Sequence, residues 1–141
     1  MNSNKFLFAW IAGTVVLFVF GYLIYGMLLA DFMKNHSGPA TGVAKSSQEY
    51  ILWLIGVANL VYAFLLTYVF SRAGVASPAK GFALGATIGL LTSLSTDLIT
   101  YATTNLATCT GILGDVVAFT VLAGVAGAVI GWVKGMGTKA A

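Results

Sequence analysis

Four long apolar stretches constrain the fold of this chain more than any other feature. They cover residues 6–29, 50–70, 79–101 and 112–133, and none of them carries a charge near its centre. A helix needs about 20 apolar residues to cross the roughly 30 Å hydrocarbon core of a bilayer, and each stretch meets that length. We therefore predict an all-α integral membrane bundle of four transmembrane helices.

The composition favours a single membrane domain. Of the 141 residues, 59% are hydrophobic and 8% are charged, which is unusual for a soluble globular domain. The four spans and their joins use nearly the whole chain, so residues 1–141 are predicted to form one four-helix domain. We expect a multi-pass protein of the cell membrane, the inner membrane of a bacterium, with the lipid bilayer as its immediate surroundings.

The basic residues predict an orientation. Basic residues in short loops favour the cytoplasmic side of a membrane. With four spans, one side carries Lys5, Arg72, Lys80, Lys134 and Lys139, and the other side carries Lys34 and Lys45. This distribution predicts that both termini are cytoplasmic. Because these residues are scattered at helix ends and form no patch, nucleic acid is not expected as a partner.

Glycines recur at four-residue spacing in the last two stretches. Small residues allow the close backbone contact through which helices associate in lipid. The glycines are Gly81, Gly85 and Gly89 in the third stretch and Gly127, Gly131 and Gly135 in the fourth. These two stretches are antiparallel neighbours, so we predict close packing between them, tightest at the cytoplasmic ends. Structural packing is the favoured interpretation, and a glycine-lined conduit is the alternative.

The four carboxylates all fall at or near the outer side in this orientation. Asp97 would lie roughly 6 Å inside the outer end of its helix. An ionisable residue within a span is costly and usually faces protein or water, so Asp97 is expected either to bond to a neighbouring helix or to belong to a polar binding site. Asp31, Glu49 and Asp115 lie at helix ends, where acids are commonly solvated or paired with lysine.

An outward-facing polar pocket is the functional alternative for these acids. Asp97, Asp31 and Asp115 are its candidate residues, together with Tyr101. His36 is interpreted as an ordinary surface residue, because a metal site generally needs three or four ligands. No metal site is predicted, and no cofactor is predicted because haem or metal ligation would call for a second histidine.

No catalytic constellation is apparent in the sequence, and we predict that the chain is not an enzyme. An intramembrane aspartyl protease needs two carboxylates that face each other from adjacent helices. At about 100° per residue, Asp97 lies roughly 120° from Gly85, and Asp115 lies roughly 120° from Gly127. On antiparallel helices these rotations would send the two acids to opposite sides of the glycine-packed pair.

The first stretch carries a family resemblance. Residues 21–29 (GYLIYGMLL) and 32–34 (FMK) make it similar to the membrane family called domain of unknown function 1761. The similarity extends weakly to Gly114-Asp115 and to the small-residue fourth stretch. The resemblance implies a small multi-helix membrane protein with no established reaction. It adds Gly21 and Tyr25 to the residues of interest, beside Asp115, without giving them a role.

Two functions are compatible with these features. The first is a small noncatalytic membrane protein, an accessory subunit or a homo-oligomer, that packs with other membrane subunits or with itself through small-residue helix faces. The second is a small transporter or binding protein for a cation or a small amphiphile, which would use Asp97 and the outer acids.

Overall fold

The computed structural model describes residues 3–136, apart from the side chain of Ser47, and this part of the chain is helical throughout its regular elements. The elements are α1 (Ser3–Gly21), the π-helix η1 (Tyr22–Leu28), α2 (Ala30–Asn35), the 3₁₀ turn η2 (Ser47–Glu49), α3 (Leu52–Arg72), α4 (Pro78–Thr103) and α5 (Cys109–Gly135).

Four helical stretches are long and apolar enough to cross a membrane, which confirms that part of the prediction. They are Ser3–Leu28, Leu52–Arg72, Pro78–Thr103 and Cys109–Gly135. A single regular helix was expected over residues 6–29. Instead, α1 continues into the π-helix η1 in the structure. Lys139, one of the residues used to predict the orientation, lies outside the described residues.

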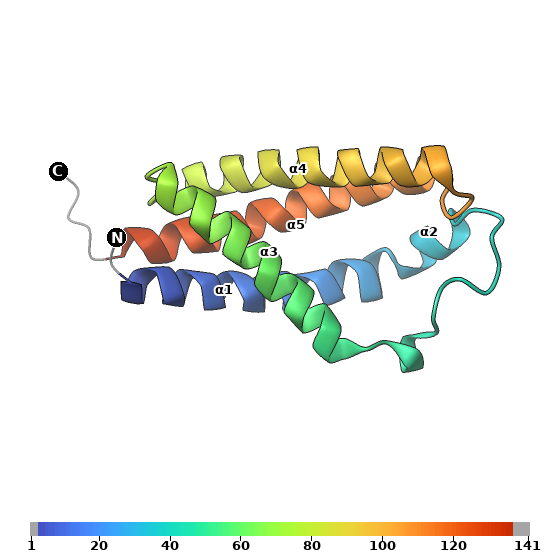
Figure 1. Ribbon diagram of the computed structural model, residues 1–141, viewed down its shortest axis with the longest axis horizontal. Coiled ribbons are helices and arrows are strands. Elements are labelled where there is room, and N and C mark those ends of the chain that lie inside the picture. The colour runs from blue at the N-terminus through green and yellow to red at the C-terminus, as the bar shows by residue number, and fades with distance from the viewer. Residues whose placement is uncertain (1–2, 137–141) are drawn as a thin grey trace.

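The helices are arranged around α5. In Figure 1, α4 and α1 lie on either side of α5, and α3 crosses α1 and α5 obliquely. The start of α1 and the end of α5 lie together at what we call the terminal end. At the opposite end, which we call the loop end, α2 lies near the join between α4 and α5. Half of the apolar window of α5 is buried, against 17% in each of the other spans, so α5 is the central helix.

The contact between α4 and α5 follows residues spaced by four. The buried residues of α4 are Gly81, Gly85, Gly89 and Ser93. Gly81 meets the backbone of Gly127 and Gly131. A Cβ atom placed on Gly85 would lie 2.5 Å from the carbonyl oxygen of Ala123. The two backbones are therefore in direct contact, and neither helix has room there for even a methyl group.

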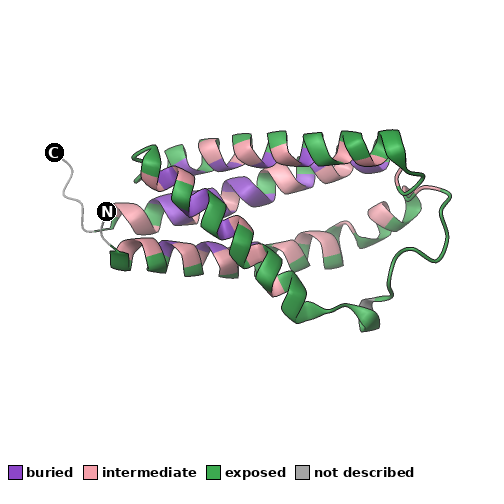
Figure 2. Cartoon of the chain, viewed as in Figure 1, coloured by how far each residue is buried: buried purple, intermediate pink, exposed green. Residues whose placement is uncertain are grey.

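The main apolar core lies nearer the terminal end, where α1, α3 and α5 meet. Its members are Ala9, Leu17, Ala63, Leu66, Phe70, Val75, Leu122, Ala126 and Ile130. The indole nitrogen of Trp10 also donates a hydrogen bond to the carbonyl oxygen of Leu60, at 2.8 Å, which ties α1 to α3. Figure 2 shows the buried residues gathered along α5 and the surfaces that face it, whereas the first half of α3 is largely exposed.

We predict that Gly85→Ala destabilises the bundle, because the added methyl group would force α4 away from α5. Overpacking of this kind typically costs about 1–3 kcal/mol. Thermal unfolding in detergent micelles would measure the loss. Gly56→Ala is the matched control, because Gly56 lies in α3 and a Cβ there meets nothing within 4 Å. Equal unfolding temperatures for the two variants would contradict the backbone contact.

Candidate functional site: a carboxyl pair at the loop end

Two carboxyl groups meet where the α4–α5 contact reaches the loop end. Asp97 follows Ser93 by one turn on α4, and Asp115 precedes Phe119 by one turn on α5. The carboxyl groups of Asp97 and Asp115 lie close enough to interact electrostatically. Both residues line a cavity of about 140 Å³. We call these two residues the carboxyl pair.

The expectation that the two acids lie on opposite sides of α4 and α5 is wrong. It treated the helices as straight and measured the interface along a line parallel to their axes. Side chains spaced by four form ridges that are inclined by about 26° to the helix axis, so helices packed through such ridges cross, and their contact follows the ridge. Counting by fours leads from Gly85 to Asp97 and from Gly127 to Asp115, which places the acids in the same contact.

The carboxyl pair contains an unsatisfied oxygen. Asp97 Oδ2 is buried and has no hydrogen-bond partner. Ionised carboxylates accept hydrogen bonds but cannot donate them, so two of them side by side repel each other unless a proton or another cation lies between them. Among the described residues, the cavity lining includes no lysine or arginine. The pair is therefore suited to hold a positive charge that comes from outside the chain.

Tyr25 joins this pair from the first span. Its hydroxyl group lies 3.5 Å from the backbone carbonyl oxygen of Asp115 and within reach of the Asp115 carboxyl group. Tyr25 lies within η1, where Leu29 N donates to Ile24 O at 2.7 Å, across five residues. Such π-helical turns are rare and often occur at functional sites. Sequence reasoning missed η1, because the residues 22–28 show no pattern that separates a π-helix from an α-helix.

A backbone clip lies beside the cavity at the loop end. It joins residues 36–40 to residues 105–108, with Gly38 N donating to Leu106 O at 2.9 Å. The Thr108 hydroxyl group donates to the carbonyl oxygen of His36 at 2.7 Å, and the same side chain accepts from Gly111 N as the cap of α5. Residues of this clip, among them Ser37 and Ala107, line the cavity.

His36 lies in this clip and also lines the cavity, although the sequence suggested an ordinary surface residue. Its ring packs against Phe32, with 4.3 Å between the ring centres. His36 Nδ1 is 2.8 Å from the carbonyl oxygen of Phe32. Since a carbonyl oxygen only accepts, Nδ1 is inferred to carry a proton, and in the neutral ring this leaves Nε2 as an acceptor.

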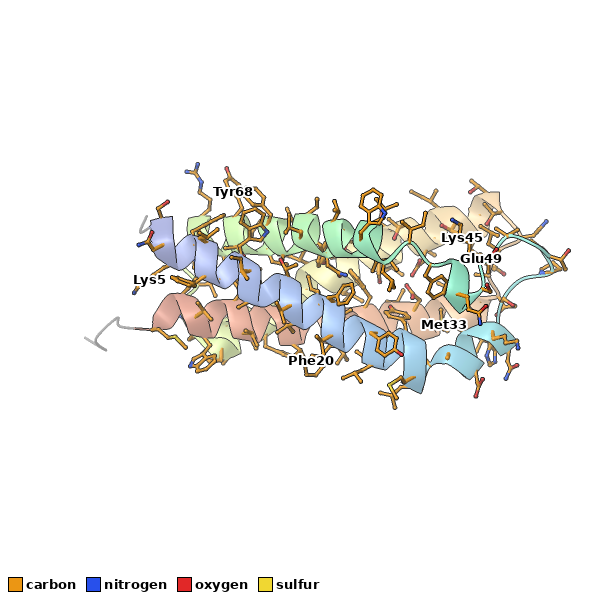
Figure 3. All side chains as sticks on the ribbon, turned by 90° about the horizontal axis from the view of Figure 1, so that it is seen from below. Lys5, Phe20, Met33, Lys45, Glu49 and Tyr68 are labelled. Carbon is orange, nitrogen blue, oxygen red and sulfur yellow. The ribbon has the colours of Figure 1, made fainter. Side chains whose placement is uncertain are left out.

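The other predicted site residues lie elsewhere. Asp31 and Tyr101 are exposed and are not among the residues that line the cavity. Glu49 accepts hydrogen bonds from the backbone nitrogen of Ser46, at 3.0 Å, and from its hydroxyl group, at 2.8 Å. The hydrogen bond from the hydroxyl group, and to a lesser extent the bond from the backbone nitrogen, lowers the pKa of Glu49 below its usual value. Figure 3 places Glu49 at the loop end with Lys45 and Met33, far from Lys5.

The remaining lining is mostly apolar and offers few metal ligands. Met33, Leu106, Ala107 and Ile112 form much of the wall. Within residues 3–136, no group of three or more His, Cys, Asp or Glu side chains is placed to hold a metal ion. The site is thus an apolar pocket with a carboxyl pair on one side, and it fits a cation better than it fits an anion or a transition metal.

No family model, curated protein or solved structure matches the chain significantly.

We predict that Gly38→Ala opens the clip, because a Cβ atom on Gly38 would collide with the backbone of Asn105. Hydrogen exchange of the amides in residues 36–40 and 105–108 should become faster. Gly42→Asn is the control within the same segment. Gly42 has a φ of 73°, which asparagine tolerates, and a Cβ there meets nothing within 4 Å. Unchanged exchange in the Gly38 variant would show that the clip does not depend on this close approach.

Proposed function

We propose that the chain is a small integral membrane protein that binds a cationic solute at the carboxyl pair and moves it across the membrane. In this proposal both termini are cytoplasmic and the loop end faces outward. The predicted excess of basic residues on the terminal side supports that orientation. The observation that carries the proposal is the convergence of Asp97 and Asp115, from neighbouring helices, on one cavity.

Charge and environment favour a cation as the ligand. Ionisable groups within a membrane span are expensive and mark ion or substrate pathways. A cation between the two carboxyl groups would relieve their mutual repulsion, and low-dielectric surroundings strengthen that attraction. The apolar walls add a surface for a small hydrophobic body, so a small organic ammonium ion has the required chemistry.

The size of the cavity favours a small solute over a polypeptide. An aspartyl protease also requires two carboxyl groups that face each other, but its substrate is a polypeptide. The size of the cavity therefore helps to separate the two functions. Pockets that bury drug-sized ligands occupy roughly 300–1,000 Å³, whereas this cavity has about 140 Å³. That volume suits a few non-hydrogen atoms and does not hold an extended peptide. We therefore propose binding and transport in place of hydrolysis.

A noncatalytic role in a membrane assembly is the second candidate. The glycine faces of α4 and α5 do not favour it, because these two helices use those faces against each other. The first half of α3 favours it instead. This segment diverges from the bundle and exposes large apolar side chains, Trp53 to 71% and Val61 to 63%. A partner helix could pack there in the bilayer.

The binding proposal is tested with the full chain in liposomes and labelled methylammonium as the probe. Asp97→Asn and Asp115→Asn should each lower binding and uptake at least about tenfold, because losing one charged partner costs on the order of 1.5–3 kcal/mol. Asp31→Asn removes a carboxylate that is exposed and outside the cavity lining, so it should behave as the wild type. Wild-type uptake by the Asp97 and Asp115 variants would rule out the proposal.

A further inference from the structure

Ser93 presents a second unsatisfied polar atom beside the carboxyl pair. The residue is 5% exposed, and its Oγ atom is buried without a hydrogen-bond partner. Hydroxyl groups within a helix ordinarily bond to the carbonyl group four residues back. The neighbouring threonines do so, with Thr92 bonded to Ile88 O at 2.8 Å and Thr96 bonded to Thr92 O at 3.0 Å. Ser93 therefore differs from the threonines beside it, because its hydroxyl group is buried and makes no such bond.

Ser93 lies one helical turn before Asp97 on α4. The two residues are one turn apart on the face of α4 that packs against α5, where Cβ atoms four residues apart are about 5–6 Å from each other. Side chains on a helix lean toward its N-terminus, so the Asp97 carboxyl group leans back toward Ser93. Ser93 Oγ and Asp97 Oδ2 are thus two buried oxygens without partners, one helical turn apart on α4, whose buried residues face α5.

An unsatisfied buried polar atom in a folded protein points to a bound water molecule or ion. A water molecule could donate to both oxygens, but it would leave the charge of the carboxyl pair unbalanced. A cation accepts electron density from both oxygens and also supplies the missing positive charge. A calcium ion takes six to eight oxygen ligands, more than these side chains provide. A monovalent ion requires less negative charge from its ligands.

We propose that one monovalent inorganic cation of the size of Na⁺ binds between Ser93 Oγ and the carboxyl groups of Asp97 and Asp115. Asp97 and Asp115 also line the cavity, whereas Ser93 is not among the lining residues. Hard cations of this size lie about 2.4 Å from each oxygen that binds them, so the three side chains would have to bring their oxygens to about that distance from the ion. The ion and a proton neutralise the same charge, so they compete, and binding of the ion releases the shared proton to solution.

Other titratable groups that face the pair are Tyr25 from η1 and His36 from the segment after α2.

The inference rests on the carboxyl pair of the proposed function, but it does not require an organic solute. It gives the proposed transporter a coupling ion, because a sodium ion seated at the carboxyl pair alters the charge that the organic cation meets in the cavity.

The test measures thermal unfolding of the full chain in detergent, in NaCl and in CsCl of equal ionic strength. At about pH 8, where a carboxyl pair tends to lose its shared proton, NaCl should raise the unfolding temperature in a saturable manner. At about pH 5 the proton occupies the site, and the difference between the salts should vanish. In weakly buffered solution, added NaCl should release protons and CsCl should not.

Two serines of α4 provide a matched pair of variants. Ser93→Ala should raise the half-saturating Na⁺ concentration at least about tenfold, because one oxygen ligand is lost. Ser95→Ala removes an exposed hydroxyl group from the same helix and should change the half-saturating Na⁺ concentration less than about twofold. If the Ser93 variant fails to fold, sodium-dependent proton release by the wild type and its loss in Asp97→Asn remain decisive.

Equal unfolding temperatures of the wild type in the two salts would overturn the inference, because no sodium-selective binding would then stabilise the fold. Equal sodium dependence of the Ser93 and Ser95 variants would also overturn it, because the ion would then bind elsewhere. Neither result affects the proposed function, which fails only if methylammonium binding is independent of Asp97 and Asp115.

Discussion

The direct backbone contact between α4 and α5 is the interaction on which the rest of the structure depends. In a bilayer, helices gain little from apolar burial and associate through close packing of small residues. The glycines spaced by four bring the two backbones together over the terminal half of the pair. Once α5 is held against α4, its other faces remain free to pack on α1 and α3, which makes α5 the centre of the bundle.

The same contact also accounts for the site. Along α4 the residues on the contact change from glycine at the terminal end to Ser93 and Asp97 at the loop end, and along α5 they change to Phe119 and Asp115. Larger and more polar side chains do not allow the direct backbone contact that glycines allow. The cavity lies at this loop end, beside the clip, and η1 brings Tyr25 to it. One continuous interface thus provides both rigidity and a polar site.

Much of the fold could be predicted from the sequence, because the length and apolarity of a span are local properties. Asp97 could likewise be identified as a residue that needs a polar neighbour, since a carboxyl group within a span is costly wherever it points. Its partner could not be found by rotating straight helices, because the inclination of the packed ridges decides which residues meet. Tyr25 and His36 reach the site through a π-helix and a loop clip, and both depend on contacts between segments far apart in the chain.

Cross-linking of the carboxyl pair positions tests the central claim most directly. Cys109, the single cysteine of the chain, is first replaced by serine, and cysteines are then introduced as Asp97→Cys with Asp115→Cys. A short bifunctional thiol reagent in native membranes should join the pair within one chain. The same reagent should not join Asp97→Cys with Val117→Cys, because Val117 is 64% exposed on another face of α5. Efficient cross-linking of the second pair and not of the first would contradict the account.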